Sequence, residues 1–275
     1  MKTYLQFVKR LLLVVTPLLT SSVVAALPTQ AATLALSKGE LLFTNFSQSP
    51  LSTLTITDTN AEAIFQGGDV ATIADAEASF TVFPPEAFNS SFSLAEGVNT
   101  DYSGFAESEA SLIGSFSVEA DKSFFFDFKA FLALQTSIDA APQENAKAIG
   151  DMSWVLFDID NNKVLDSFNI AGGLFTEDNN DFLKVNNSKN IVISNQKSES
   201  SFGGKEEFAT VLVQGSLQRT FANTTNVALV EVKRNQVTVK APEPSDNIAL
   251  LISSGVIGIA LKYRRKVNNA CFLKE

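Results

Sequence analysis

Residues 112–134 read LIGSFSVEADKSFFFDFKAFLAL, and this stretch carries the clearest structural pattern in the chain. Apolar and polar residues alternate on both sides of Asp121-Lys122, with Phe125 as the one exception. A period of two places the apolar side chains on one face of a β-strand. The stretch therefore predicts two half-buried strands that pair in antiparallel fashion around a turn near Asp121-Lys122.

The same period recurs along the chain and predicts two further hairpins. One consists of strands at 152–157 and 164–170 around the polar turn Asp160–Lys163, and the other of strands at 226–232 and 237–240 around Lys233–Gln236. More strands are expected at 51–57, 79–83, 190–194 and 208–214, with long loops at 59–79 and 138–151. Stretches with a helical period are scarce. The pattern predicts an all-β fold, a β-sandwich of jelly-roll-like topology.

The N-terminal segment has the composition of a secretory signal peptide. Lys2, Lys9 and Arg10 precede an apolar stretch at 11–27, which is followed by Pro28-Thr29-Gln30-Ala31. Small residues at Thr29 and Ala31 suit a signal peptidase, so we expect residues 1–31 to be removed after Ala31. An uncleaved N-terminal anchor is the alternative, and both interpretations imply export.

The C-terminal segment combines a proline-rich box, an apolar run and a basic cluster. Ala241-Pro242-Glu243-Pro244-Ser245 leads into the uncharged run 248–261, which is followed by Lys262, Arg264, Arg265 and Lys266. The prolines favour an extended, accessible conformation. The apolar run is slightly shorter than the ~17 to 25 residues of a typical spanning helix. The basic cluster predicts that the C-terminal end of the apolar run lies at the cytoplasmic side, with residues 267–275 as a cytoplasmic tail.

Residues 241–266 resemble the PEP-CTERM sorting signal of exported proteins in bacteria that make extracellular polysaccharide. The resemblance implies a membrane-embedded exosortase as a partner, with Pro242, Glu243 and Pro244 as its recognition box. It also implies that Lys262, Arg264, Arg265 and Lys266 hold the tail for processing. It covers only these residues and carries no information about 32–240. An ordinary C-terminal tail anchor is the alternative.

The segment 32–240 is strongly acidic and is expected to form one exported domain. The whole chain has 21 basic and 30 acidic residues, and removing the eight basic and three acidic ones of the two terminal segments leaves a net charge of −14. Such a surface repels nucleic acid and anionic lipid, so neither is expected as a partner.

The residue types that most enzymes use are scarce in this chain. It has no histidine, and its one cysteine, Cys271, follows the apolar run. These absences exclude Ser-His-Asp and Cys-His arrangements and the usual zinc sites. Carboxylate chemistry, a serine–lysine pair or no chemistry is left, and we predict a protein that is not an enzyme and needs no cofactor.

One stretch has the oxygen donors of a possible calcium site. Asp158, Asp160, Asn162 and Asp166 follow a spacing similar to that of a calcium-binding loop. Lys163 stands where such a loop needs glycine, and Asn169 where it needs a bidentate glutamate. Calcium binding is therefore one interpretation, and a solvated hairpin turn is the other.

Two further sets of residues are candidates for carbohydrate recognition or cleavage. Tyr102 lies between polar residues and is a candidate for an exposed ring that stacks on a sugar, whereas Trp154 lies in an apolar run and is expected in the core. The acidic residues Glu107, Glu109, Asp127 and Asp158 could supply a glycosidase pair. Glu107 and Glu109 would lie about 7 Å apart on one face of a strand. A solvated acidic face is the alternative.

Together, the sequence predicts an exported protein of the cell envelope, cell surface or extracellular matrix that binds extracellular polysaccharide or has a structural role. The alternative is a secreted hydrolase, such as a glycosidase, that uses carboxylates alone.

Overall fold

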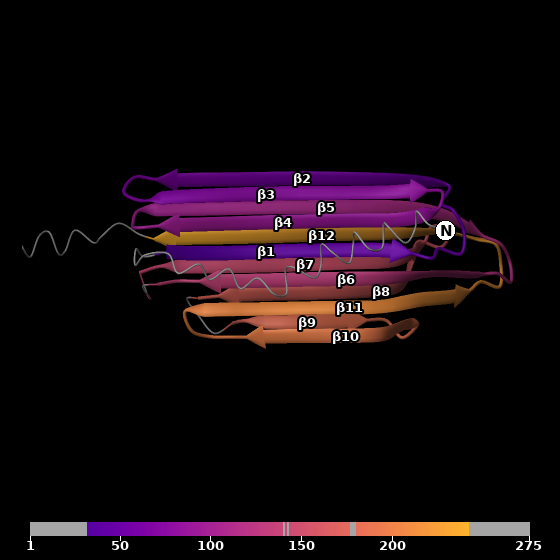
Figure 1. Cartoon of the computed structure of the whole chain (residues 1–275). Coiled ribbons are helices and arrows are strands. Elements are labelled where there is room, and N and C mark those ends of the chain that lie inside the picture. The colour runs from indigo at the N-terminus through magenta and orange to yellow at the C-terminus, as the bar shows by residue number, and fades with distance from the viewer. Residues whose placement is uncertain (1–31, 140, 142, 177–179, 242–275) are drawn as a thin grey trace, which may run out of the picture. The chain divides into compact units, whose positions relative to one another are not determined.

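The computed structural model describes residues 32–139, 141, 143–176 and 180–241 (Figure 1). The predicted signal peptide with Ala31, the box Pro242, Glu243 and Pro244, the apolar run and the basic residues Lys262, Arg264, Arg265 and Lys266 lie outside these ranges. Within them the chain forms twelve β-strands and no helix. The described part accordingly has no helix long and apolar enough to cross a membrane.

The strands form two antiparallel sheets of six strands each, so the all-β prediction and the two-sheet sandwich are confirmed. Sheet A consists, in spatial order, of β10 (Ile191–Ser201), β11 (Glu206–Thr220), β6 (Ser123–Ser137), β1 (Ala32–Thr44), β4 (Pro85–Val98) and β3 (Asp69–Val82). Sheet B consists of β2 (Ser52–Phe65), β5 (Tyr102–Val118), β12 (Thr225–Ala241), β7 (Asn145–Asp158), β8 (Lys163–Phe175) and β9 (Phe182–Asn187).

The fold-defining stretch forms its two strands, but their predicted pairing is wrong. β5 pairs with β2 and β12 in sheet B, whereas β6 pairs with β1 and β11 in sheet A. The turn at Ala120-Asp121 therefore carries the chain from one sheet to the other. Alternation predicts which face of a strand is buried, and both strands bury that face, but it contains no information about the neighbouring strand.

The second predicted hairpin is confirmed, and the third is wrong. β7 and β8 pair around a turn at 159–162. By contrast, residues 225–241 form the single strand β12, and the predicted turn residues Lys233 and Asn235 point into the interior with no exposed surface. This polar stretch can remain in a central strand because the opposite sheet supplies hydrogen-bond partners for it.

Both predicted long loops contain strand, the first over most of its length and the second over half. Most of the first consists of β2 and β3, whose connection at 66–68 includes Gly67 and Gly68. The second ends at Asn145, where β7 begins. The Thr-rich strand β2 is exposed along nearly its whole length, so its sequence has little apolar alternation, whereas β3 turns every second residue from Val70 to Phe80 partly inward.

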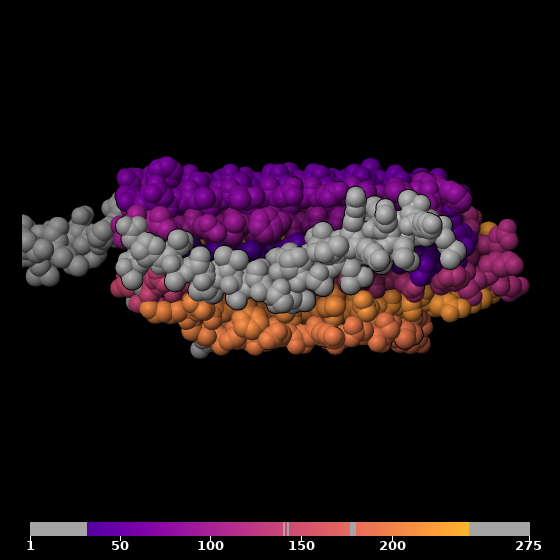
Figure 2. Space-filling model, in the orientation of Figure 1, coloured from indigo at the N-terminus to yellow at the C-terminus, as the bar shows by residue number. Residues whose placement is uncertain are grey.

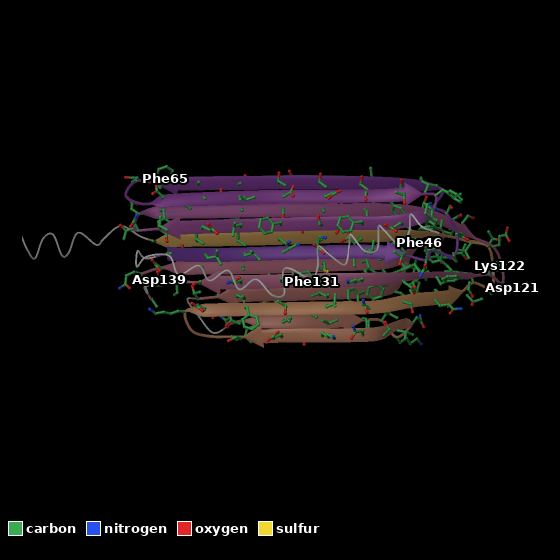
Figure 3. The ribbon with its side chains drawn as sticks, in the orientation of Figure 1. Phe46, Phe65, Asp121, Lys122, Phe131 and Asp139 are labelled. Carbon is green, nitrogen blue, oxygen red and sulfur yellow. The ribbon has the colours of Figure 1, made fainter. Side chains whose placement is uncertain are left out.

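One end of the interior is filled by aromatic rings from both sheets, which we call the aromatic end. It consists of Phe43, Phe46, Phe80, Phe116, Phe124, Phe126, Phe128, Trp154 and Phe168. Phe126 of sheet A lies 5.2 Å from Trp154 of sheet B, centroid to centroid, in an edge-to-face arrangement. Figure 3 shows Phe46 at this end, close to the turn that contains Asp121. Such rings contribute large apolar areas and favourable edge-to-face contacts to the core.

Candidate functional site

A cluster of polar side chains lies in the middle of the interior, and we call it the polar cluster. It consists of Asn89, Ser91 and Ser93 from β4, Ser108 from β5, and Glu231, Lys233 and Asn235 from β12. All seven are buried. The cluster exists because β4 and β12 both direct a run of polar residues inward at the same height of the sandwich.

Asn89 links the two ionisable members of the polar cluster. The Lys233 ammonium donates to Asn89 O at 2.8 Å and also to Asn89 Oδ1, and Asn89 Nδ2 donates to Glu231 Oε2. The aliphatic part of Lys233 crosses β1 at Gly39, where a Cβ atom would approach Lys233 Cδ to 2.6 Å. A glycine at this position thus leaves room for the lysine in the core.

Burial disfavours the charged forms of both ionisable groups. Desolvation raises the pKa of Glu231 to about 8, against the opposing effects of Lys233 and Asn89. Desolvation lowers the pKa of Lys233 to about 7, although Glu231 and Glu40 act in the opposite direction. Such perturbed values are common at active sites. Both side chains have no exposed surface, however, so a substrate cannot contact them without opening the sandwich.

The remaining members of the polar cluster are tied across the two sheets. Asn235 Nδ2 donates to Ser91 O and Ser91 Oγ at 2.8 Å each, and Ser93 Oγ donates to Asn235 O at 3.1 Å. Within the described chain, Glu231 Oε1 and Asn235 Oδ1 have no hydrogen-bond partner. The cluster fixes the relative position of β4 and β12, which is a structural role.

Tyr102 does not occupy the exposed position that the sequence suggests. Its exposed fraction is 3%, and its hydroxyl forms a 2.7 Å hydrogen bond with Thr33 Oγ1. The ring fills the space beside Gly97, where an added Cβ would lie 2.1 Å from it. The ring is therefore closed to a sugar, and this interpretation of Tyr102 is wrong. Trp154 is buried as expected, with an exposed fraction of 1%.

The three aspartates of the calcium-like spacing accept hydrogen bonds from protein donors at separate places. Asp158 accepts from the backbone and side chain of Asn161, and Asp160 accepts from both nitrogens of Asn226. These two backbone and side-chain bonds lower the pKa of Asp160.

Asp166 lies further along β8. It accepts from Ser188 Oγ, Asn190 Nδ2 and Arg219 Nη1 at 2.8 to 2.9 Å. In the described ranges no three His, Cys, Asp or Glu side chains are grouped to hold a metal ion, so calcium binding by Asp158, Asp160, Asn162 and Asp166 stays a prediction.

Glu107 and Glu109 do lie on one outer face, as the sequence suggests. They line a hollow of about 300 Å³ on sheet B together with Asp58, Thr59, Asn60 and Arg234. Arg234 Nε donates to Glu107 Oε1, and this bond raises the pKa of Arg234. The other predicted carboxylates lie elsewhere, Asp127 on sheet A and Asp158 at the end of β7.

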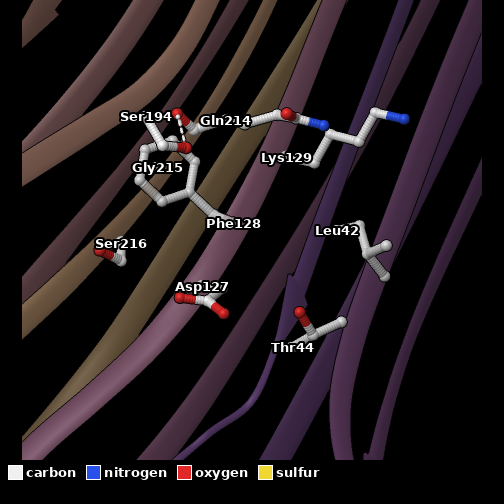
Figure 4. Close-up of a pocket in the computed structure, with 9 residues that line it drawn as sticks. All are labelled: Leu42, Thr44, Asp127, Phe128, Lys129, Ser194, Gln214, Gly215 and Ser216. Atoms are coloured by element: carbon white, nitrogen blue, oxygen red, sulfur yellow. Dashed lines mark hydrogen bonds between the residues drawn. The ribbon is translucent and has the colours of Figure 1, made fainter.

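A second hollow, of about 390 Å³, lies on the outer face of sheet A (Figure 4). Thr44 and Asp127 lie at one end of it, and Lys129, Gln214 and Ser194 lie at the other. Ser194 Oγ donates to Gln214 O at 3.1 Å, next to a bulge in β10. Hydroxyl, amide, carboxylate and ammonium groups thus converge on one shallow depression.

Partly exposed phenylalanines lie on the same outer face. Phe88 and Phe92 of β4 and Phe131 of β6 point away from the core, since their neighbours in the strand are buried. In the register, Glu40 lies between Phe131 and Ser90, and Lys38 lies opposite Phe92. Figure 3 shows Phe131 midway along the sheet. Their spacing places Phe88 and Phe92 on one face of the strand, but nothing in the sequence marks that face as the outer one.

Comparisons with family models, with curated proteins and with solved structures gave no match for this chain.

Proposed function

We propose that this chain is an exported protein of the cell envelope or extracellular matrix, whose sandwich binds extracellular polysaccharide through the outer face of sheet A. The observation that carries the binding part is the set of partly exposed rings Phe88, Phe92 and Phe131 beside polar and charged groups. Ring faces pack against the C–H groups of a pyranose, and polar side chains bond its hydroxyls.

The geometry of sheet A suits a linear ligand. The rings lie on two strands, with the ion pair between Lys38 Nζ and Glu40 Oε1, 2.8 Å long, among them. The hollow at Lys129 and Gln214 continues this surface, because Leu42 lies opposite both Phe88 and Lys129 in the register. An extended chain of sugars could therefore contact rings and polar groups in succession.

The export part of the proposal is supported by the sequence. We infer export from three segments. These are a signal peptide at 1–31, a PEP-CTERM-like signal at 241–266 with a proposed membrane helix, and a proposed cytoplasmic tail at 267–275. An exosortase-type enzyme is the proposed processing partner, and the membrane is the site of transient anchoring. We also propose that the sandwich has a jelly-roll-like topology.

Polysaccharide binding is tested by co-sedimentation of the protein with the extracellular polysaccharide of the producing cells. The variants Phe92→Ser and Phe131→Ser should each weaken the apparent affinity at least about tenfold, because each loss of a buried apolar contact is worth ~1.4 kcal/mol or more. Phe83→Ser is the matched control, since Phe83 is 90% exposed in the β3–β4 connection, away from this face. Equal binding by all three variants would contradict the proposed face.

The same assay, repeated with a chelator, tests the calcium hypothesis. If calcium at Asp158, Asp160, Asn162 and Asp166 supports binding, chelation should weaken it, and Asp160→Asn should reproduce that loss. Binding that is insensitive to chelator removes calcium from the proposal and leaves the sheet A surface in place.

Sorting is tested by replacing Arg264, Arg265 and Lys266 with alanine in the producing cells. We expect the precursor to accumulate and the protein to be misplaced, because the basic cluster holds the C-terminal end at the cytoplasmic side. Normal processing and localisation of this variant would count against the sorting proposal.

A carboxylate-dependent hydrolase is the second candidate function. The observation in its favour is that Glu107 and Glu109 share a hollow on sheet B. A hydrolase should release sugar from the polysaccharide and should lose this activity in Glu109→Gln. A matrix protein should release no sugar, whether as the unaltered protein or as Glu109→Gln. One assay of reducing ends therefore separates the two functions.

A further inference from the structure

Each sheet has an edge strand at either side, and the edges at the two sides differ. β2 and β3 form one side, and β9 and β10 form the other (Figures 1 and 2). An unpaired strand edge is a template for another strand, so proteins commonly interrupt, shorten or charge such edges.

The side with β9 and β10 has these protective features. β9 is only six residues long and contains the exposed Lys184. β10 has a bulge between Ile193 and Asn195 and carries the exposed Lys197. A second strand would find neither a long nor a regular edge here.

The edge of β2 is neither short nor interrupted. Its fourteen residues pair with β5 in an uninterrupted register, and its sequence contains neither proline nor lysine. Leu54, Ile56 and Ile64 on its outer face are 52%, 55% and 64% exposed. This long, regular and partly apolar edge is the kind that pairs with another chain.

The register shows which main-chain groups of β2 are free. Gln66 N donates to Asp101 O directly opposite it, and bonded pairs recur at every second residue of an antiparallel ladder. The even-numbered residues therefore bond β5, and the odd-numbered ones point their N–H and C=O groups outward. Thr59 is one of these outward-facing residues, and in the single molecule its N–H donates to Asp58 Oδ1 at 2.9 Å, a bond that pairing with another strand would replace.

We propose that β2 pairs with β2 of a second copy of this chain, antiparallel, about a two-fold axis at Thr59. In this register Thr57 faces Ala61, Leu54 faces Ile64, and Asp58 faces Asn60 of the other copy. Odd-numbered residues meet odd-numbered residues, so the free main-chain groups form about a dozen hydrogen bonds. Sheet B then continues across both molecules.

The charges of β2 are compatible with this pairing. Its acidic side chains on the outer face are Asp58 and Glu62, and in the proposed register they lie opposite Asn60 and Ile56. No like charges face each other directly, which would be destabilising. The chain as a whole has a net charge of −9, so two copies repel at long range, and added salt should strengthen the association.

Cysteine cross-linking of the full chain tests both the partner and the register. Thr59→Cys, made with Cys271→Ser, places two cysteines at the axis, where Cα atoms about 5.5 Å apart allow a disulfide. We expect mild oxidation to convert most of it into a covalent dimer. Thr57→Cys in the same background should cross-link at least about tenfold less, because its two copies lie roughly 14 Å apart. Ser198→Cys on β10 is the control for random collision.

A second variant links the cross-link to the free edge. Thr57→Pro removes an outward N–H, which an edge strand tolerates, and should abolish both the cross-link of Thr59→Cys and the dimer seen by sedimentation. If its unfolding midpoint falls, Ala61→Lys replaces it as the blocking change. Equal cross-linking at positions 57, 59 and 198, or a monomer at all concentrations and salt levels, would overturn the proposal.

Discussion

The aromatic end and the polar cluster occupy the same interior, but they hold the two sheets together by different physical means. At the aromatic end, rings from both sheets pack edge to face, as Phe126 and Trp154 do. In the polar cluster, directed hydrogen bonds join Asn89 to Lys233 and Glu231. Packing tolerates exchange of similar shapes, whereas a buried polar network requires every partner. The difference predicts how each region responds to substitution.

The largest expected effect is at the aromatic end. Phe126 contacts four other rings and has no exposed surface. Phe126→Ala should therefore lower the free energy of unfolding by about 3 to 5 kcal/mol, measured by denaturant titration. Phe125→Ala, at the neighbouring residue, which is 43% exposed, is the control and should cost under about 1 kcal/mol. Similar losses at both positions would show that ring packing is not what stabilises this end.

Loss of Lys233 should be nearly as costly, for a different reason. Lys233→Ala leaves Asn89 Oδ1 without its ammonium donor and should reduce the free energy of unfolding by about 3 kcal/mol. Replacing the whole unit, with Asn89→Leu, Glu231→Leu and Lys233→Met together, should recover most of that loss, because the three side chains that bond one another are then removed together. If the triple variant is less stable than Lys233→Ala, the polar cluster does not require every partner, and it then responds to substitution as the aromatic end does.

The polar cluster should also make stability depend on pH, which the aromatic end cannot do. The pKa of Glu231 is raised by desolvation to about 8, so its contribution is present below the unfolded value and is lost as the pH rises to 8. The pKa of Lys233 is lowered to about 7, so its contribution is present at high pH and is lost as the pH falls to 7. The free energy of unfolding should thus be lowest between pH 7 and 8.

Urea titrations at pH 5, 7.5 and 10 measure this profile, whose depth we expect to be about 1 to 3 kcal/mol. Glu231→Gln should remove the fall between pH 5 and 7.5 and leave the rise towards pH 10. Glu62→Gln on the exposed strand β2 is the control and should retain the minimum. A profile of the same shape in Glu231→Gln would assign the pH dependence to other groups.

The smallest expected effect concerns a single neutral hydrogen bond beyond the polar cluster. Thr33→Val removes the bond to the Tyr102 hydroxyl and should cost about 1 kcal/mol of unfolding free energy. Tyr102→Phe should cost a similar amount, and the double variant little more than either, because both remove one interaction. Additive losses would indicate that the two groups do not depend on each other.

The sequence predicts the fold class well because strand alternation records burial directly. Phe116, Phe124 and Phe126 are buried and Phe125 is exposed, as the period of two requires. The β7–β8 hairpin follows from its polar turn, since the two strands are neighbours in the chain. Neighbouring strands at the β5–β6 turn instead separate into two sheets, and alternation alone does not distinguish these outcomes.

Sites formed by distant residues were beyond such reasoning. Lys233 and Asn235 look like a solvated turn until β4 supplies Asn89 and Ser91, 144 residues away in the sequence. Tyr102 has polar neighbours in sequence but lies next to Thr33 and Gly97 in space. The shared face of Glu107 and Glu109 could be predicted, because it depends only on their separation by two residues in one strand.

The continuous course of β12 has a mechanical consequence. The strand pairs with β5 along its entire length and with β7 from Val227 to Lys240, and the C-terminal segment of the chain leaves from its end at Ala241. A pull applied there acts along the strand axis, so both ladders of hydrogen bonds bear the force together instead of opening one after another. Forced extraction of such a strand is governed by the unfolding rate, and a central strand bonded on both sides resists it. A protein held by its C-terminus at a surface under flow would thus carry the load through a strand that is paired on both sides along nearly its whole length.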